Sequence, residues 1–367
     1  MSTKKLNENN FLIEKIKVLR SKTIRKKSKF EDERLDKPVS FWIKEDRLLK
    51  EKGKEFTIIL RTKGCSWALG ETGGCSMCGY IQDSTIVEID PNHIINQFDY
   101  ALQKKIKEIS IDKDDFILKI FNSGSFFDDD EISADVREHI YKKIAEIPKI
   151  KEIVVESRVD YITREKLKKM KGILENKYIE VAIGLETVND YIRNIYVNKG
   201  LKFEDFLKAV QICKENNIGV RVYLLFKPPF LNEQTAIDDC ASSIQKLAEL
   251  KVNTISINPL NIQKNSLVEY LWYQNRYRPP WFYSLFKCII KACKDNSILD
   301  SVRIISSPSG AGSKRGIHNC LKRDCNEFMI NSLKEFVISQ NINCLVKKDD
   351  SYSCGCLIKY QLQKNFI

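Results

Sequence analysis

Short apolar runs alternate with longer amphipathic segments along most of the chain. The runs are rich in β-branched and aromatic residues, which is typical of buried strands. Six of them are expected strands: residues 57–62, 116–121, 153–156, 181–185, 220–226 and 254–258. Between them apolar residues recur three or four positions apart, which predicts helices at 93–109, 133–147, 164–173, 203–216 and 233–250.

This alternation predicts an α/β fold in which a parallel sheet curls into a partial (β/α)6 barrel. A doubly wound open sheet is the alternative. In both arrangements ligands bind at the carboxyl ends of the strands, so the residues that follow each strand are the candidates for function. The chain shows no internal repeat and no Gly/Ser-rich linker, which favours one compact barrel.

Two flanking segments differ from the barrel in composition. Between positions 15 and 29 there are eight basic residues and no acidic one, and apolar residues at 12, 13, 16 and 19 follow a helical period. We interpret this as a basic helical extension that contacts RNA or forms a solvated arm. After position 280 we expect a helix at 281–294, a strand at 302–306 and a helix at 326–340. The predicted domains are 1–50, 51–280 and 281–367.

Composition narrows the class of protein. The chain has 367 residues, 12 cysteines and a net charge of +12, and it lacks a secretory signal or an apolar run of about 20 residues. We therefore expect a cytoplasmic protein whose cysteines serve metal or thiol chemistry and not disulfides. The positive charge calls for a polyanionic partner, and nucleic acid is the leading candidate.

Three cysteines, Cys65, Cys75 and Cys78, directly follow the first expected strand in a glycine-rich loop with the spacing C-x9-C-x2-C. A [4Fe-4S] cluster normally takes four thiolates, so three would leave one iron open to an external ligand. S-adenosylmethionine fills that position in radical chemistry. Three quarters of a zinc site, or three unrelated buried cysteines, are the alternatives.

Several further motifs carry a resemblance to a known family. They lie at 37–42, 60–67, 277–281 and 318–320, and read KPVSFW, LRTKGCSW, YRPPW and HNC. With the cysteine triplet they resemble the radical-SAM family that contains the Elongator catalytic subunit, and more narrowly the radical-SAM subunits of archaeosine synthase. The resemblance covers roughly residues 37 to 360.

The resemblance implies which side chains at the strand ends contact S-adenosylmethionine. Backbone and side chains after the second strand would hold its amino group. Acidic and basic groups after the later strands would contact its ribose, adenine and carboxylate, and two residues beside the cluster would lie against its adenine. These candidates are Ser123, Gly124, Ser125, Glu156, Arg158, Glu186, Lys227, Met77 and Tyr80. A Ser/Gly turn, a helix cap at Glu186, an RNA-phosphate contact at Lys227 and a core tyrosine are the corresponding alternatives.

A second cysteine group lies near the C-terminus. Cys320, Cys325, Cys354 and Cys356 resemble a four-ligand structural zinc site, with His318 as a substitute ligand. Their spacing is irregular, and an auxiliary [4Fe-4S] cluster is the alternative. The remaining cysteines stand in helical or apolar surroundings and are expected to be packing residues: Cys213, Cys240, Cys288, Cys293 and Cys344.

The expected function, implied by the resemblance, is radical cleavage on tRNA. The substrate would be a 7-cyano-7-deazaguanine base to which a partner transferase has attached lysine, and loss of the lysine carbon-nitrogen bond would leave archaeosine. An electron donor is required, and Asp128, Asp129, Asp130, Glu131 and Lys227 are candidates for recognising the lysine. A methylthiotransferase or methylase, and a nonenzymatic zinc-dependent RNA-binding protein, are the alternatives.

Overall fold

The computed structural model describes residues 3–25, 32–294, 297–346 and 354–366. Its centre is an eight-stranded sheet in which the strands follow one another in sequence order. The strands are β1 (Ser40–Arg47), β2 (Lys52–Ile59), β3 (Phe116–Phe121), β4 (Ile150–Glu156), β5 (Tyr178–Glu186), β6 (Gly219–Phe226), β7 (Thr254–Pro259) and β8 (Arg303–Ile305). β1 pairs antiparallel with β2, and all other neighbours are parallel.

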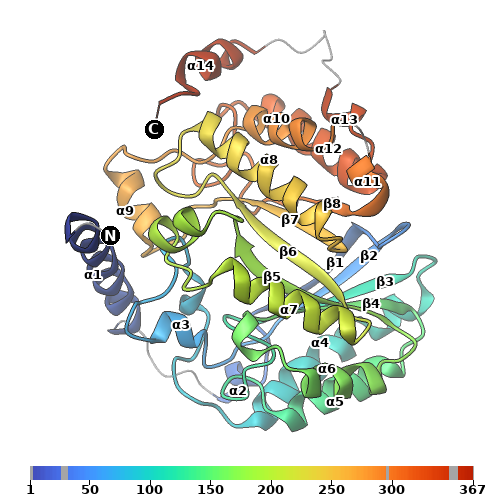
Figure 1. Ribbon diagram of the computed structural model, residues 1–367. Coiled ribbons are helices and arrows are strands. Elements are labelled where there is room, and N and C mark those ends of the chain that lie inside the picture. The colour runs from blue at the N-terminus through green and yellow to red at the C-terminus, as the bar shows by residue number, and fades with distance from the viewer. Residues whose placement is uncertain (1–2, 26–31, 295–296, 347–353, 367) are drawn as a thin grey trace.

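Helices cover the outer face of this sheet (Figure 1). They are α4 (Pro91–Ile111), α5 (Ala134–Ala145), α6 (Arg164–Ile173), α7 (Phe203–Glu215), α8 (Glu233–Glu249) and α10 (Phe282–Ala292). The main hydrophobic core lies between these helices and the strands. A doubly wound sheet reverses its strand order at a switch point, whereas this order never reverses. The predicted partial barrel is therefore confirmed and the open doubly wound sheet is wrong.

The sheet is larger than the sequence analysis predicted. β1 was not expected, because its sequence SFWIKEDR carries four charges and shows no clear apolar alternation. β2 begins at Lys52, five residues before the predicted strand. The charged residues of both strands find partners only in the folded sheet. Glu45 pairs with Lys52 at 2.7 Å, and the Trp42 indole donates to Glu55 at 2.7 Å.

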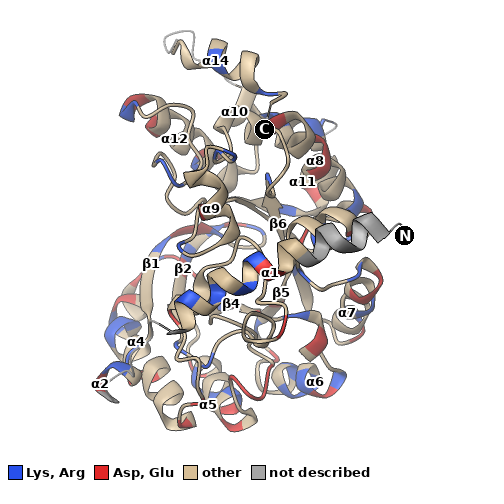
Figure 2. Cartoon of the chain, turned by 90° about the vertical axis from the view of Figure 1, so that its left-hand side faces the viewer, with Lys and Arg blue, Asp and Glu red and all other residues tan. Residues whose placement is uncertain are grey.

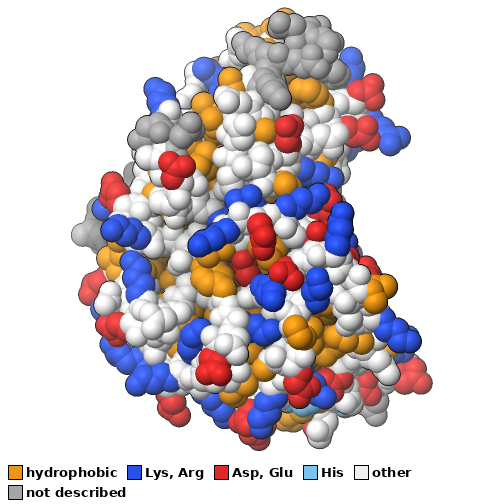
Figure 3. Space-filling model, turned by 90° about the vertical axis from the view of Figure 1, so that its right-hand side faces the viewer, with side chains coloured by type: hydrophobic (Ala, Val, Ile, Leu, Met, Phe, Trp, Pro, Cys, Tyr) orange, Lys and Arg blue, Asp and Glu red, His pale blue; other side chains and the backbone are white. Residues whose placement is uncertain are grey.

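The inner face of the barrel is polar near the amino ends of the strands. Arg303 donates to Glu152 and Glu180, each at 2.9 Å, and Arg221 also donates to Glu180 at 2.9 Å. All four side chains are buried. The molecular surface on the right-hand side of Figure 1 carries Lys, Arg, Asp and Glu side chains intermingled (Figure 3). The buried pairs that Arg303 and Arg221 form with Glu152 and Glu180 lie at the amino ends of the strands, and we call them the lower layer of the barrel.

The opposite edge is covered by three helices. α1 (Thr3–Arg25), the short α3 (Ser66–Leu69) and α9 (Leu267–Tyr273) lie on the side toward which the parallel strands run (Figures 1 and 2). The expected N-terminal helix therefore forms, and Ile16 packs it onto a second core cluster with Val197, Leu260 and Val268. The basic positions 26, 27 and 29 of the predicted extension lie outside the described residues.

The C-terminal part adds α11 (Ser297–Ser301), α12 (Arg323–Ser339), α13 (Asn343–Val346) and α14 (Cys356–Gln363), and the remaining short elements are α2 (Asp32–Leu35), η1 (Tyr80–Gln82), η2 (Val159–Tyr161) and η3 (Ile192–Tyr196). β8 corresponds to the strand expected at 302–306. Among the helices of the described ranges, none has both the length and the apolar character needed to span a bilayer. The division into domains 1–50, 51–280 and 281–367 stays a prediction.

Candidate active site

The three N-terminal cysteines lie in a loop of residues 64–80, the cysteine loop, between β2 and η1. The Cys65 N–H donates to the Ser123 carbonyl at 3.1 Å and so joins the first cysteine to the loop after β3. Ser76 stands between the other two cysteines. Its N–H donates to the Val197 carbonyl at 2.8 Å and its hydroxyl to the Tyr196 carbonyl at 2.7 Å. The loop is thus fixed at both ends to different strand connections.

The segment after η3 holds the middle of the cysteine loop. The Trp67 indole N–H donates to the Asn198 carbonyl at 2.8 Å, and the Asn198 amide donates to the Gly74 carbonyl at 2.8 Å. Gly200 has φ +60°, and a Cβ there would lie 2.3 Å from the Trp67 ring. Only glycine permits this close approach, so the indole and the segment fit together without adjustment.

Arg20 of α1 bridges two points of the cysteine loop. Its Nε donates to the Gly73 carbonyl and one terminal nitrogen donates to the Cys78 carbonyl, both at 2.9 Å. The residue is 4% exposed. Gly73, at φ +71°, lets the α1 backbone approach, because a Cβ there would lie 3.1 Å from Lys17 Cα. The basic N-terminal helix therefore covers the cysteine loop, a contact that sequence reasoning missed.

The three thiols lie close enough to influence one another. Burial raises the pKa of Cys65 and of Cys75, and the proximity of Cys78 adds to the rise for both. For Cys75 the pKa reaches about 12, and nearby Lys199 opposes the rise. Burial therefore favours the protonated thiol at Cys65 and at Cys75. A bound metal must displace their protons, as metal-binding thiols ordinarily require.

A buried carboxylate supports the loop after β3. Glu131 accepts hydrogen bonds from three groups: Thr62 Oγ1 at 2.9 Å, Asn122 Nδ2 at 2.9 Å and the Ser125 N–H at 2.8 Å. A Cβ on Gly124 would lie 1.7 Å from a Glu131 oxygen, so this position must be glycine. Burial raises the pKa of Glu131 to about 7. Ser123, Gly124 and Ser125 thus form a turn held by Glu131, and its role in binding a cofactor stays a prediction.

Glu156 and Glu186, the last residues of β4 and β5, lie near Lys199, which follows η3. Glu186 accepts from Lys199 Nζ at 2.7 Å. Loss of hydration raises the pKa of Glu156 to about 7, with Lys199 opposing and Glu186 adding to the rise. Burial would lower the pKa of Lys199, but Glu186 raises it overall. Sequence reasoning missed Lys199, because nothing in the sequence links position 199 to the strand ends.

The backbone around Glu186 is unusual for a strand. Glu186 has φ +70°, and the pairing with β6 shifts register between Gly184 and Glu186. A Cβ on Gly184 would lie 2.5 Å from Lys199 Nζ. Glu186 does not cap the following turn, because the Asn189 side chain accepts from the N–H groups of Tyr191 and Ile192. Left-handed backbone at a charged residue is uncommon and marks functional sites.

Arg158 has partners that fix it beside the cysteine loop. Its guanidinium donates to Asp160 at 2.9 Å, to the Lys199 carbonyl at 3.1 Å and to the Gly200 carbonyl at 3.2 Å, and lies 5.1 Å from the Trp67 ring centroid. These contacts join the end of β4 to the segment after η3. A cofactor contact by Arg158 stays a prediction.

The remaining candidates lie around this space. Met77 packs against the second core cluster, while the Tyr80 side chain is 56% exposed. Lys227 is buried, with its ammonium 2.6 Å from Glu233 and 2.9 Å from the Arg278 carbonyl. Of the acidic run at 128–131, Asp129 pairs with Lys166 at 2.8 Å. Roles in cofactor or substrate binding stay predictions for all of them.

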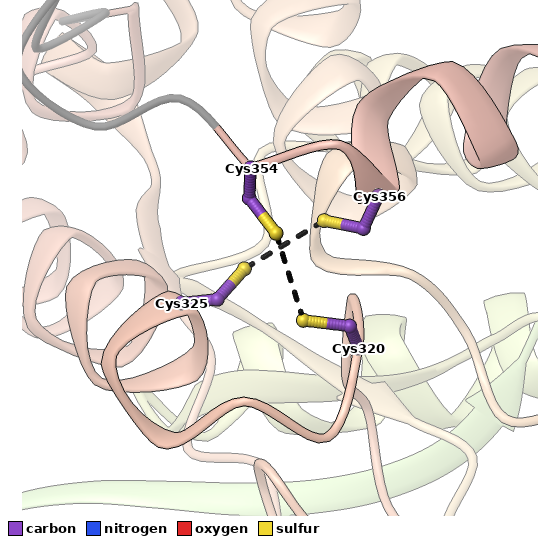
Figure 4. Close-up of side chains that lie close together, drawn as sticks. All are labelled: Cys320, Cys325, Cys354 and Cys356. Atoms are coloured by element: carbon purple, nitrogen blue, oxygen red, sulfur yellow. Dashed lines mark hydrogen bonds between the residues drawn. The ribbon is translucent and has the colours of Figure 1, made fainter.

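The four C-terminal cysteines meet in one place. Their sulfurs all lie within 4.8 Å of one another, and Cys320 to Cys354 and Cys325 to Cys356 are each 3.8 Å apart (Figure 4). Trp281 and Tyr360 pack beside them. The His318 Nδ1 lies 2.8 Å from the Gly316 carbonyl, and His318 is not in the compact group. Four thiols in this arrangement can hold a metal.

Comparison with known proteins agrees with this geometry. The family model described as "Radical SAM superfamily" matches residues 59–242 of this chain. The chain is 37% identical to archaeosine synthase subunit beta of Methanosarcina acetivorans, over 87% of this chain and 88% of that one. It is 38% identical to archaeosine synthase subunit beta of Thermococcus kodakarensis, over 83% and 91%. An uncharacterized protein of Methanocaldococcus jannaschii is 38% identical over 93% and 90%.

Among solved structures, Methanocaldococcus infernus Elp3 with an N-terminal deletion aligns with a TM-score of 0.50 at 16% identity. The match covers 68% of this chain and 60% of that protein, and it supports the fold alone. The predicted resemblance is confirmed by the sequence relatives. This chain belongs to the radical SAM superfamily, in the family of archaeosine synthase subunit beta.

Proposed function

We propose that this radical SAM enzyme acts on tRNA and completes the formation of archaeosine. The observation that carries the proposal is the rigid cysteine loop beside Glu156, Glu186 and Lys199, in a chain 37% identical to archaeosine synthase subunit beta over most of its length. Cys65, Cys75 and Cys78 would hold a [4Fe-4S] cluster with one iron open. When bound, the cluster and S-adenosylmethionine supply a 5′-deoxyadenosyl radical that removes hydrogen from carbon.

The residues present suit this group. Cys65, Cys75 and Cys78 share one loop, and Cys78 lies near enough to raise the pKa of both other thiols, which supports a shared metal site. Lys199 would offer a positive charge to the carboxylate of the cofactor, and Glu186 would lie beside its adenine, as the resemblance implies. Glu156, with a pKa near 7, can accept a hydrogen bond from a ribose hydroxyl when ionised.

The substrate we propose is a 7-cyano-7-deazaguanine base in the dihydrouridine loop of tRNA, carrying a lysine added by a partner transferase. Abstraction of hydrogen from the lysine carbon bonded to the side-chain nitrogen would leave a carbon radical. Loss of one electron from this radical to the oxidised iron-sulfur cluster would give an iminium, and addition of water would then break the carbon-nitrogen bond, release the lysine fragment as an aldehyde and leave the amidine of archaeosine. The name "subunit beta" of the relatives supports a partner subunit. An electron donor would reduce the cluster. The net charge of +12 supports a polyanionic substrate.

Isotope transfer tests the reaction. Substrate tRNA deuterated at the lysine carbon next to nitrogen is incubated anaerobically with reconstituted enzyme, S-adenosylmethionine and dithionite. We expect deuterium in 5′-deoxyadenosine and archaeosine in the tRNA, both detected by mass spectrometry. Cofactor cleavage with unlabelled 5′-deoxyadenosine would contradict the site of abstraction. Accumulation of the lysine-bearing base in cells lacking this protein would establish the substrate.

We further propose that Cys320, Cys325, Cys354 and Cys356 bind one structural zinc ion. In a tetrahedral site with Zn–S of about 2.3 Å, the sulfurs lie about 1.63 times that distance apart, or ~3.8 Å. The two sulfur pairs at 3.8 Å have this spacing. A cube of four irons would hold its thiolates farther apart, which argues against an auxiliary cluster and so against a methylthiotransferase. Metal analysis should give about four irons and one zinc per chain.

A further inference from the structure

Two motifs that the chemistry at the cysteine loop does not use, YRPPW at 277–281 and HNC at 318–320, meet around one cavity. The cavity has a volume of about 310 Å³ and lies between the end of α9, the segment after it and the loop before α12. It is lined by Trp272, Asn275, Tyr277, Arg278, Pro279, Lys314, His318 and Leu321. None of these residues is acidic.

The walls of this cavity are held by internal hydrogen bonds. Arg278 donates to the carbonyls of His318 and Asn319, at 2.8 and 2.9 Å, so one guanidinium joins both motifs. The same group lies 3.7 Å from the Trp281 ring centroid. The Tyr277 hydroxyl donates to the Lys227 carbonyl at 2.8 Å. The wall formed by Tyr277, Arg278 and His318 is therefore preformed, which reduces the ordering cost of binding a ligand.

The chemistry of the lining suits an aromatic base that carries a phosphate. The half-buried Trp272 offers a ring surface, and the exposed Asn275 amide can both donate and accept hydrogen bonds. Lys314 is exposed and supplies a cation for phosphate. The His318 Nδ1 lies 2.8 Å from the Gly316 carbonyl, so the other ring nitrogen is the one that can hydrogen-bond a base edge.

The position of the cavity connects it to the cysteine loop. The N–H of Leu267, the first residue of α9, donates to the Ser76 carbonyl at 2.9 Å, and Trp272 lies near the other end of this helix. A helix of seven residues is about 10 Å long. A strand whose target base lies at the cysteine loop could therefore place a neighbouring nucleotide in the cavity.

We propose that this cavity binds a nucleotide of the RNA substrate close to the base that is modified. The proposal rests on the proposed function, because it takes tRNA as the substrate. The base would stack on Trp272, its phosphate would contact Lys314, and His318 and Asn275 would face its edge. The site thus positions the RNA and takes no part in the radical step.

Equilibrium binding of a substrate tRNA transcript, at several salt concentrations, tests the proposal. For Lys314→Gln we expect weaker binding and a reduction of about one in the slope of log K against log salt. For Trp272→Ala we expect a loss of about 5- to 150-fold with an unchanged salt slope, because a base stack contributes about 1–3 kcal/mol. Trp272→Phe should retain most of the affinity. Lys168→Gln, at an exposed position on α6, is the control and should bind as wild type.

The outcomes separate the two proposals. Wild-type affinity in both Lys314→Gln and Trp272→Ala would overturn the nucleotide site while leaving tRNA as the substrate. Failure of the wild-type protein to bind tRNA would overturn the tRNA substrate as well. Guanosine or adenosine monophosphate should displace tRNA only at millimolar concentration. Displacement by micromolar mononucleotide would show a site for a free nucleotide and would overturn the assignment to the RNA strand. Thermal unfolding of each variant controls for folding.

Discussion

Replacing Arg20 should loosen the cysteine loop even though Arg20 lies 45 residues before Cys65 and belongs to a helix expected from its charge to contact RNA. The buried guanidinium donates to the carbonyls of Gly73 and Cys78. Hydrogen bonds to a charged group contribute about 1.5–3 kcal/mol each. Arg20→Met removes both and leaves two carbonyls in a largely dry contact, so we expect a loss of ~3 kcal/mol or more in the stability of the loop.

Hydrogen exchange of the apoprotein measures this loss directly. The amides of Ser76 and Cys78 are bonded within the loop contacts, to Val197 and Cys75. A loss of ~3 kcal/mol corresponds to roughly a hundredfold faster exchange through local opening. The reconstituted Arg20→Met protein should also lose iron faster to a chelator. Arg20→Lys should rescue only partly, because an ammonium lacks the planar fork that spans two carbonyls.

A matched control separates loop support from charge. Lys22→Met removes one positive charge from an exposed position of the same helix. It should leave exchange of Ser76 and Cys78 unchanged, and any effect on tRNA affinity would report the electrostatic role of α1. Equal exchange in Arg20→Met and wild type, with equal iron retention, would refute the support role. Deleting residues 1–30 cannot make this distinction, because it removes both side chains.

Three other changes test the site. Gly184→Ala should displace Lys199 and weaken S-adenosylmethionine binding by about tenfold or more in an equilibrium binding assay. Its control is Gly172→Ala, at a helix position where an added Cβ would have no atom within 4 Å, which should bind normally and unfold at a slightly higher temperature. Equal binding by both variants would contradict the packing argument. Cys354→Ser should lose about one zinc per chain with iron unchanged, as checked by elemental analysis. Burial raises the pKa of Glu131 from 4.5 to about 7, so the folded state holds this proton more tightly than the unfolded state does. The free energy of unfolding should therefore fall by up to ~3 kcal/mol as the pH rises from about 4.5 through 7. Glu131→Gln should flatten that part of a profile of denaturant midpoint against pH.

Local sequence patterns predicted most of the fold because the parallel strands are buried on their outer face and read as apolar runs. β1 escaped this reasoning, since its second half is a run of four charged residues whose partners come from other parts of the chain. Glu55, for example, accepts from Lys119 and from the Trp42 indole. Such pairs become visible only when strands distant in sequence lie side by side. The predicted strand at 57–62 was displaced for the same reason.

The site was predictable where spacing carries chemistry and unpredictable where a single side chain crosses the structure. The cysteine triplet and the C-terminal cysteines stand out in sequence. Arg20 is one of eight basic residues in its segment, and nothing local distinguishes this buried side chain from the exposed Lys22. Lys199 depends on Gly184, fifteen positions earlier, because only a glycine there leaves room for its ammonium. Tertiary contacts, and not local pattern, select these residues.

The inner face of the barrel has two layers of charged residues, one at the amino ends and one at the carboxyl ends of the strands. The two layers differ in charge balance, which indicates where a ligand binds. In the lower layer, burial alone would raise the pKa of Glu180, but Arg303 and Arg221 hold it at about 2. The upper layer lies at the carboxyl ends of β4 and β5, where Glu156 and Glu186 share the Lys199 ammonium. There the pKa of Glu156 rises to about 7. Buried charge without full compensation costs stability, and proteins retain it chiefly where a ligand binds. The upper layer has one lysine for two carboxylates, so a bound cationic sulfonium at the carboxyl edge would add positive charge there.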